Sequence, residues 1–302
     1  MKRRFSVIIA TYNREEYVRQ AIDSVLSQTF TDYELIVVDD GSTDHTPEVL
    51  QSYGAQIKTI RQVNQGPGTA YKMGGLHASG EYLAFLDSDD LFMPWALAAY
   101  DKIIRMLDSP PLILGSITRF TEGQDVQTGG EDVDIIEVFK YRDYLSKDVG
   151  IGLAQSRIVM RKSVFEEVSG TAIPRFLNDY NLMLQAGTYG PCVIVRLPTT
   201  VAYRQHETQG SKNVERMIEG VFSLIRAVRR GQCSGGRTRC FAKYAFLGGP
   251  VCEWSRKALN SNRPGLAFRL LMNGGPMVAA AALRKFWFLF HPTATPLILP
   301  HE

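Results

Sequence analysis

The sequence predicts an α/β fold, in which a mostly parallel, twisted sheet is flanked by helices and followed by a C-terminal helical extension. Two observations lead to this prediction. Over about the first hundred residues, short apolar stretches alternate with stretches of helical periodicity. After His206 the pattern becomes helical and basic. Alternating strands and helices of this length are typical of a parallel sheet with helices on both faces.

The expected elements follow one another in order. Strands are predicted at residues 5–11, 33–38, 57–63 and 82–86. Helices are predicted at 15–27, from 46 to 54, and from the Gly/Pro-rich loop 64–68 to about 78. In the second helix Thr46 is the expected N-cap, Pro47 lies in the first turn and Gly54 ends the helix. The polar, Gly-rich stretch 121–134 predicts a loop or lid.

The composition indicates a globular protein of one large domain, or one domain with an appendage, because 45% of the 302 residues are hydrophobic and 22% are charged. Four cysteines without CxxC spacing disfavour a zinc site or disulfide framework and favour a reducing cytosol. The apolar start superficially imitates a signal peptide but is too short, so we interpret it as the first strand. No stretch is expected to reach the roughly 20 apolar residues of a transmembrane helix.

The charge is distributed unevenly along the chain. Residues 1–210 hold 20 Lys and Arg against 27 Asp and Glu, whereas residues 211–302 hold 14 against 4, a balance of +10. A basic tail suggests an anionic partner such as a membrane surface or nucleic acid, or else basic residues that merely solvate amphipathic helices. Arg284-Lys285 precedes the aromatic stretch 286–290, as in an interfacial helix on anionic lipid. A helical cap that packs these aromatics on the main domain is the alternative.

Acidic residues follow two of the expected strands, where ligands bind in sheets of this kind. Asp39 and Asp40 follow one strand, and Asp87, Asp89 and Asp90 follow another. Two carboxylates about 4 Å apart repel by roughly 4 kcal/mol at an effective dielectric near 20. Such a cluster therefore suggests a bound cation, and oxygen ligands suit Mg²⁺ or Mn²⁺ with substrate phosphates completing the shell. For an isolated cluster, a solvated acidic turn is the alternative.

The acidic cluster belongs to a series of segments that together resemble family 2 of the glycosyltransferases, which have the GT-A fold. The segments are 5–13, 28–30, 33–44, 64–66, 78–90 and 93–94, in the family's order and spacing. The resemblance is dense to about residue 94 and intermittent to about 206. It implies transfer of a single sugar from a nucleoside diphosphate-sugar, most simply a UDP-sugar, to a hydroxyl of a glycan or lipid-linked acceptor. Synthesis of a bacterial cell-surface polysaccharide or glycolipid is the setting that it suggests.

The resemblance gives roles to residues at the second acidic cluster. Asp87-Ser88-Asp89 resembles the DxD motif of these nucleotide-sugar enzymes. Asp89 matches the position that ligates Mn²⁺ or Mg²⁺, and Asp87 matches the position that faces the ribose. His206 matches a position that helps to hold the metal or the diphosphate in some members. Arg204 is a further candidate for contact with the diphosphate.

The first acidic cluster resembles the nucleoside-binding part of the family. Asp40, with Asp39 beside it, matches the carboxylate that hydrogen-bonds the base. Ala10 and Tyr12 match first-strand positions that line the nucleoside pocket, where an aromatic ring can stack on the base.

The family usually carries its catalytic base as the Asp of a Glu-Asp pair at the start of a helix. Asp179 has this position here, although Asn178 replaces the Glu. A helix-start aspartate favoured by the helix dipole is the alternative interpretation. A single base on the far side of the sugar implies direct displacement with inversion at the anomeric carbon. The family's Ala-Arg-Asn segment is also changed, because Tyr71-Lys72 follows Ala70 in this chain.

The resemblance divides the chain into a nucleotide-sugar-binding half (1–108), an acceptor-binding half with the base (109–210) and a basic helical extension (211–302). A cytoplasmic protein is expected, with peripheral attachment to the inner face of the plasma membrane through the extension as a further possibility and no nucleic-acid partner. A nucleotidyltransferase of related architecture and a non-catalytic nucleotide-sugar-binding protein are the alternatives. The segment after the first strand is not a GxGxxG loop, which disfavours a dinucleotide-binding enzyme.

Overall fold

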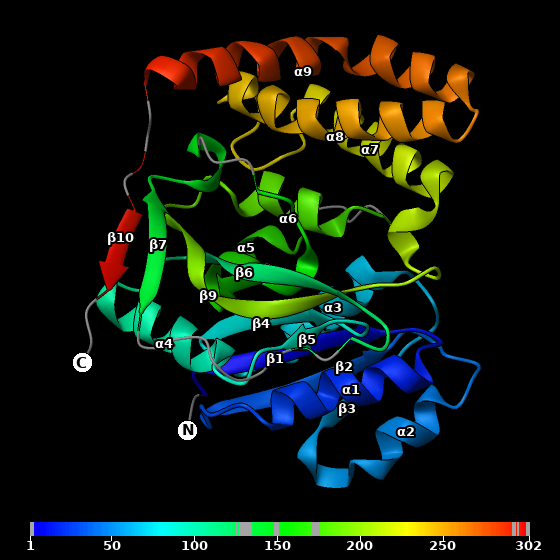
Figure 1. The fold of residues 1–302 in the computed structure, drawn as a ribbon, viewed down its shortest axis with the longest axis vertical. Helices are drawn as coiled ribbons and strands as arrows, with labels where there is room; N and C mark the ends of the chain where they lie inside the picture. Colours follow the sequence, from blue (N-terminus) through cyan, green and yellow to red (C-terminus); the bar gives the residue numbers. More distant parts are fainter. Residues whose placement is uncertain are drawn as a thin grey trace.

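The computed structural model describes residues 3–124, 126, 135–147, 151–170, 176–291, 294 and 296–299. Within them, one mixed sheet runs in the order β10-β7-β9-β6-β8-β4-β1-β2-β3, and β5 pairs with β9 outside this path (Figure 1). The strands are β1 (Phe5–Thr11), β2 (Tyr33–Asp39), β3 (Lys58–Arg61), β4 (Tyr82–Asp87), β5 (Leu91–Phe92), β6 (Leu112–Thr121), β7 (Ile136–Tyr141), β8 (Ile158–Arg161), β9 (Cys192–Gln205) and β10 (Pro296–Leu299).

Helices cover both faces of this sheet. They are α1 (Glu15–Leu26), α2 (Thr46–Ser52), α3 (Pro67–Leu76), α4 (Ala96–Met106), α5 (Lys162–Val168), α6 (Asn178–Ala186), α7 (Val214–Arg229), α8 (Cys240–Asn260) and α9 (Pro264–Phe290). Alternate strand residues point to opposite faces. Val7 and Ile9 of β1 therefore pack with α1, α2 and α4, whereas Ile8 and Ala10 pack with α3, α5 and α6. The predicted α/β architecture is confirmed.

The early elements form where the sequence predicts them, with small differences at their ends. Thr46 is the first residue of α2 and His45 is its N-cap. The Thr46 hydroxyl instead accepts the backbone N–H of Arg14, so the N-cap prediction was wrong. Gly54 opens a short 3₁₀ turn after α2 instead of ending that helix. Of the predicted loop or lid at 121–134, residue 121 ends β6, and residues 125 and 127–134 lie outside the described residues.

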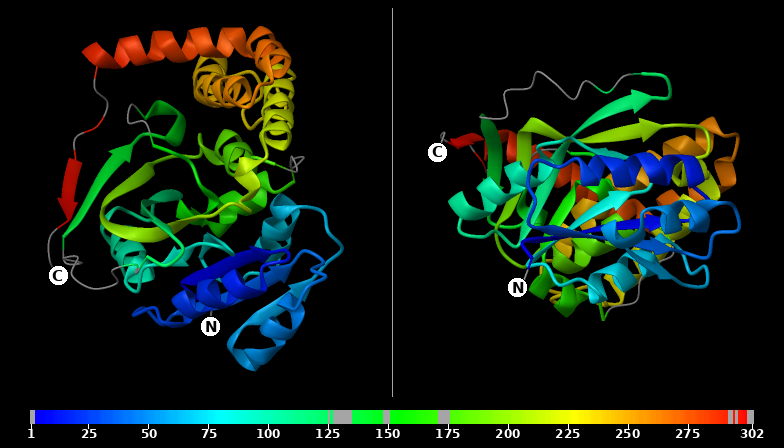
Figure 2. Two further views of the ribbon diagram at one scale, coloured as in Figure 1. Left: turned by 45° about the vertical axis from the view of Figure 1, so that its right-hand side comes forward. Right: turned by 90° about the horizontal axis from the view of Figure 1, so that it is seen from below.

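The C-terminal extension adds a helical layer that lies beyond α6. Helices α7, α8 and α9 share an apolar cluster with Leu177 and Leu184, at and within α6. Figures 1 and 2 show α8 and α9 side by side at the end of the molecule opposite α2. The extension is not purely helical as predicted, because β10 returns to the sheet and pairs antiparallel with β7, Leu299 opposite Ile136.

The prediction that no stretch is long and apolar enough to span a membrane was wrong for α9. This helix has 27 residues and passes that test by length and composition. Only 28% of its most apolar stretch is buried, whereas a core helix of this composition would be mostly buried. Gly274-Gly275-Pro276 interrupts the apolar sequence but not the helix, which is why the pattern was missed.

Candidate active site

The sheet register brings the two acidic clusters to the same edge. In the ladders of β1, Thr11 lies beside Asp39 of β2, and Ala10 lies beside Asp87 of β4. Neighbouring strands are about 4.8 Å apart, so Asp39 and Asp87 stand on either side of β1 at a backbone separation of about 10 Å. The carboxyl ends of these three parallel strands therefore form one site.

The loops that follow β1 and β2 are joined by their own polar side chains. The Asn13 amide oxygen accepts the backbone N–H of Thr43 at 2.8 Å, and the Asn13 N–H donates to the Ser42 hydroxyl at 2.9 Å. Gly41 has a φ of +80°, and a Cβ there would lie 3.0 Å from the backbone of Asn64. A glycine is needed at this turn, which sets the direction of the acidic pair before it.

Asp40 is buried and links β2 to the start of α3. One carboxylate oxygen accepts the Gln62 side-chain amide at 2.7 Å and the Gln65 backbone N–H at 2.9 Å. Within the described residues, the other oxygen accepts only the Gly66 N–H, at 2.8 Å. A carboxylate oxygen has two lone pairs, so this second oxygen retains capacity for one further donor. Asp39 lies beneath it, bonded to the Ser42 N–H and paired with Arg61.

A cleft of about 620 Å³ opens above these strand ends. Ala10, Tyr12 and Asp40 line one side of it, together with the loop at Asn64 and Gly66. Tyr12 is 45% exposed, so its ring is available to a ligand in the cleft. The other predicted contacts of the nucleotide-sugar, Asp39, Asp87, Ser88 and Arg204, do not line this cleft, and all of them except Asp87 are buried. The predicted metal ligands Asp89 and His206 and the predicted base Asp179 do not line it either.

The other side of the cleft comes from α7 of the helical extension and from Phe176, just before α6. The lining residues there are Phe176, Arg216, Glu219, Gly220, Ser223 and Arg226. Those on α7 recur at spacings of three and four, which places them on one face of that helix. The sequence analysis missed them because their spacing is that of any amphipathic helix, and only the tertiary fold turns this face toward β1.

Asp89 is held by two residues from the end of β9. The His206 Nε2 lies 2.9 Å from Asp89 Oδ2, and the Arg204 Nε donates to the Asp89 backbone carbonyl at 2.8 Å. Arg204 also donates to the Gln20 side chain at 2.7 Å, and its guanidinium stacks over Phe120. Arg204 thus positions Asp89, and its contact with a diphosphate stays a prediction.

Asp87 and Asp90 share a buried network with Ser156. The backbone N–H of Asp87 donates to the Ser156 hydroxyl, which donates to Asp90 Oδ2 at 2.6 Å. The Tyr71 hydroxyl donates to Asp87 at 2.6 Å. Burial, followed by the charge of Asp89, raises the pKa of the Asp87 carboxyl to about 7. Burial and the same neighbouring charge also raise the pKa of the Asp90 carboxyl well above its ordinary value.

The paired side chains of Asp89 and His206 fit a divalent metal. One carboxylate oxygen and one imidazole nitrogen face each other across 2.9 Å, and this donor set suits Mn²⁺ and is tolerated by Mg²⁺. Among the described residues no group of three or more His, Cys, Asp or Glu side chains could hold a metal. A metal here would take its remaining ligands from phosphate oxygens and water.

Asp179 stands in the first turn of α6, as predicted. Burial raises the pKa of its carboxyl to about 6, and its charge contributes to the raised pKa of Asp87. Asp179 and the acidic cluster therefore lie close enough to interact. Asn178, which stands where the family usually has Glu, donates to the Gln155 side chain at 3.0 Å.

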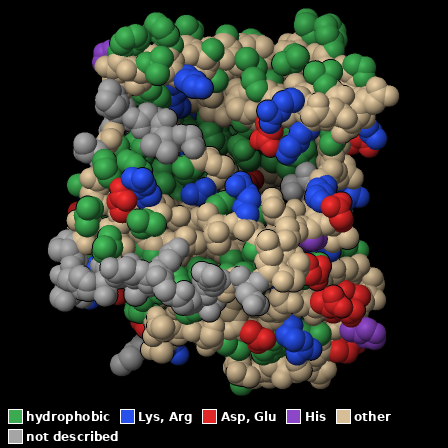
Figure 3. Space-filling view, in the orientation of Figure 1, with side chains coloured by type: hydrophobic (Ala, Val, Ile, Leu, Met, Phe, Trp, Pro, Cys, Tyr) green, Lys and Arg blue, Asp and Glu red, His purple; other side chains and the backbone are tan. Residues whose placement is uncertain are grey.

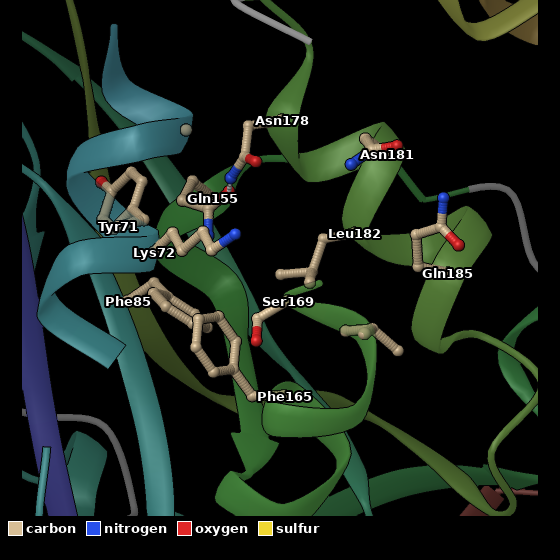
Figure 4. A pocket seen from close by; sticks show the side chains of 12 residues that line it. Tyr71, Lys72, Phe85, Gln155, Phe165, Ser169, Asn178, Asn181, Leu182 and Gln185 are labelled. Atoms are coloured by element: carbon tan, nitrogen blue, oxygen red, sulfur yellow. Dashed lines mark hydrogen bonds between the residues drawn. The ribbon is translucent and has the colours of Figure 1, made fainter. Parts of the chain in front are cut away.

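Figure 4 shows a small cavity beside this helix start, between α3 and α6. Lys72 of α3 and Asn178 of α6 line it, with Gln155 between them. Its volume of about 20 Å³ has room for a single water molecule. The Gln155 Nε2 is buried without a partner in the described structure, so such a water would have a donor to accept from.

Known proteins resemble this chain in sequence and in fold. The family model described as glycosyl transferase family 2 matches residues 6–169, more than half of the chain. The chain belongs to glycosyl transferase family 2. The match includes both acidic clusters at the strand ends and stops before Asp179 and the helical extension.

Several relatives of this family 2 chain are themselves named uncharacterized glycosyltransferases. One from Nostoc sp. is 43% identical over 109 residues, which are 35% of this chain and 34% of the relative. One from Haemophilus influenzae is 30% identical over 188 residues, 60% of each chain. The chain spans about a third of the length of the first curated relatives that it matches.

Solved structures show the fold of this family 2 protein. Residues 1–349 of TarS from S. aureus, in complex with UDP-GlcNAc, superpose with a TM-score of 0.59 at 17% identity, covering 96% of this chain and 92% of that one. Another structure of the same TarS fragment gives 0.61 at 18% identity, covering 93% and 82%. The mixed sheet and its flanking helices therefore form a GT-A fold, as the resemblance implied.

Proposed function

We propose that this family 2 protein is a metal-dependent, inverting glycosyltransferase that moves one sugar from a UDP-sugar to a hydroxyl of a glycan or lipid-linked acceptor. The observation that carries the proposal is that Asp40 and Asp89 follow β2 and β4, the strands on either side of β1, while Asp179 of α6 is near enough for its charge to act on Asp87. Work in the cytoplasm, on a bacterial cell-surface polysaccharide or glycolipid, belongs to the same proposal.

The donor nucleoside binds in the cleft beside β1. Tyr12 offers an exposed ring for stacking on the base, and the Asp40 oxygen with spare capacity accepts an N–H of the base. A uracil has one such N–H beside its two carbonyls. The TarS structure with UDP-GlcNAc, which shares the fold, supports a uridine donor.

The diphosphate of the donor lies near Asp89 and His206. These two side chains would hold the metal, which supplies Lewis-acid stabilisation of the charge that develops on the leaving diphosphate. Arg204 fixes the Asp89 main chain, and Asp87 faces the ribose while Tyr71 holds its carboxyl. The enzyme therefore needs no covalent nucleophile of its own.

Asp179 removes the proton from the acceptor hydroxyl. A pKa of about 6 leaves this carboxyl mostly ionised at neutral pH, yet more basic than an ordinary aspartate. The acceptor oxygen attacks the anomeric carbon on the face opposite the diphosphate. One displacement of this kind inverts the configuration at that carbon.

Product analysis with the purified protein tests the proposal against its rivals. A glycosyltransferase incubated with Mn²⁺, a UDP-sugar and an acceptor, or water as a slow acceptor, releases UDP. A nucleotidyltransferase would release pyrophosphate from UTP and a sugar phosphate, and a non-catalytic binding protein would be stabilised by UDP without turnover. Release of pyrophosphate, or binding with no UDP release for any UDP-sugar and acceptor tried, would overturn the proposal.

A further inference from the structure

The inner face of α9 packs against α8 and, to a smaller extent, against α7. Both helices carry a Gly-Gly-Pro segment at mid-length, and the two segments lie where the helices touch. A Cβ on Gly248 of α8 would lie 2.4 Å from the Met277 carbonyl, and a Cβ on Gly274 of α9 would lie 2.6 Å from Val251. This close seam fixes which side of α9 faces outward.

The outer face of α9 is apolar along the whole helix. Phe268, Met272, Leu283, Phe286 and Phe290 are each 63–66% exposed. At 100° per residue these five side chains fall within one narrow stripe, and no charged residue shares it. We call these five residues the α9 ridge. Hydrophobic side chains lie along this edge of the molecule over α9 in Figure 3.

The charge beside the α9 ridge is positive. The charged residues of α9 are Arg269, Arg284 and Lys285, and none is acidic. Arg269 and Lys285 are exposed. By the same helical geometry Arg269 borders one side of the ridge, whereas Lys285 lies beyond its other side, farther round the helix. The extension from residue 211 onward has a balance of +10. A partner that covers the ridge therefore needs an extended apolar surface bordered by negative charge.

We propose that the α9 ridge inserts into the interface of a lipid bilayer that contains anionic lipid, with α9 lying parallel to the membrane. A bilayer provides apolar depth beneath a layer of anionic headgroups, which matches both the ridge and its cationic flanks. Trp287, beside the ridge and 59% exposed, is a residue type that favours this interface. The occupant that we assign is thus the lipid surface itself.

The flanking elements determine that α9 lies along the membrane and does not cross it. Before α9, helix α8 runs antiparallel to it and packs along its inner face. After α9, β10 pairs with β7 of the central sheet, and near its end Arg284 donates to the Lys147 carbonyl. Both ends of α9 are therefore held on the side of the catalytic fold.

Flotation with lipid vesicles tests this inference without any sugar donor, so its outcome is independent of the proposed function. The intact protein should float with vesicles of phosphatidylcholine and phosphatidylglycerol, and at least about tenfold less with phosphatidylcholine alone. Added salt should weaken the binding because it screens the cationic flanks. The double variant Phe286→Glu/Phe290→Glu should lose flotation, whereas Leu76→Glu, at an apolar position of α3 that is 53% exposed, should keep it.

Three further results decide the inference even if a variant folds poorly. Trp287 emission should shift to the blue with anionic vesicles and be quenched by brominated acyl chains, while Trp254 is buried and should not respond. Alkaline carbonate should release the bound protein, because α9 does not span the bilayer. Failure of the wild-type protein to float, resistance to carbonate, or a lipid-free dimer that the double variant abolishes would each overturn it, the last by assigning the ridge to a second copy.

Discussion

The strand-end site and the α9 ridge are opposite in how their side chains are satisfied. At the strand ends, Asp40 accepts three hydrogen bonds and Asp89 is held by His206 and Arg204. On the α9 ridge, large apolar side chains stand more than half exposed. The comparison teaches that the side chains of the first region are preorganised for a small polar ligand. The apolar surface of the second region is buried only when an extended partner covers it.

The largest effect is expected from Asp89→Ala, which removes one of the two proposed metal ligands. Transfer should fall by about a thousandfold or more, because the developing charge on the leaving group loses its stabilisation. The stabilisation of the protein by Mn²⁺ with UDP in a thermal melt should also disappear. Asp32→Ala, an exposed carboxylate near the start of β2, serves as the control. Unchanged turnover by Asp89→Ala would remove the metal site from the proposal.

Asp179→Asn should lower transfer by about a hundredfold to ten-thousandfold, with donor binding retained, because the base is lost but the cleft is not. In the wild type, kcat/KM should rise with pH and level off above about 6, the pKa of this carboxyl. Full transfer activity in Asp179→Asn would assign the base elsewhere.

The same substitution should stabilise the fold at neutral pH. The folded pKa of about 6 lies above the ordinary value of 3.8, so ionisation costs stability. The stabilising effect of the bound proton is complete below about pH 4 and is lost as the pH rises through about 6. Because the Asp179 side chain is half-buried, the gain for Asn at pH 7 should be about 2 kcal/mol, measured by urea unfolding.

Two glycine substitutions compare a helix packed on the central sheet, α3, with a helix of the extension, α8. A Cβ on Gly74 of α3 would lie 2.4 Å from Ile8, which is fully buried, so Gly74→Ala should cost about 1–3 kcal/mol of unfolding free energy. Gly249→Ala in α8 has no atom within 4 Å and should gain up to about 1 kcal/mol from helix propensity. Equal effects of the two substitutions in urea unfolding would contradict this account of α3 packing.

The smallest effect is expected at the α7 side of the cleft, where the helical extension faces the strand ends. Arg226→Ala should raise KM for the UDP-sugar by about fivefold, with kcat almost unchanged, because an exposed cation contributes only about 1 kcal/mol to binding an anionic donor. Arg230→Ala, an exposed arginine just after α7 that does not line the cleft, is the matched control. A loss of kcat instead of donor binding would place Arg226 at the acceptor.

The first ninety residues were predictable because their structure is local. Strand β1 begins and ends at the predicted residues, and the other early strands and helices differ from their predictions by at most a few residues, since apolar periodicity and turn residues determine them. The shared edge for Asp40 and Asp89 followed from the rule for parallel sheets. The positions of Asp39 beneath the cleft and of Arg204 behind Asp89 were not predictable, because both depend on contacts between distant segments.

The extension was less predictable for the same physical reason. Pairing of β10 with β7 joins residues about 160 positions apart. Strand β10 has only four residues, too few for a sequence pattern that predicts a strand. The Gly-Gly-Pro segment of α9 concealed a continuous helix, because these residues usually end helices in sequence analysis. The division of the chain at residues 108 and 210 stays a prediction.

Asp40 has a consequence for how donor preference can evolve in this protein. The same carboxylate that is proposed to select the base also anchors the loop from Gln62 to Gly66, so replacing it would release three donors and loosen the start of α3. A lineage that adopts a different nucleotide is therefore expected to keep this aspartate and to vary Tyr12, whose exposed ring can change without releasing these three donors.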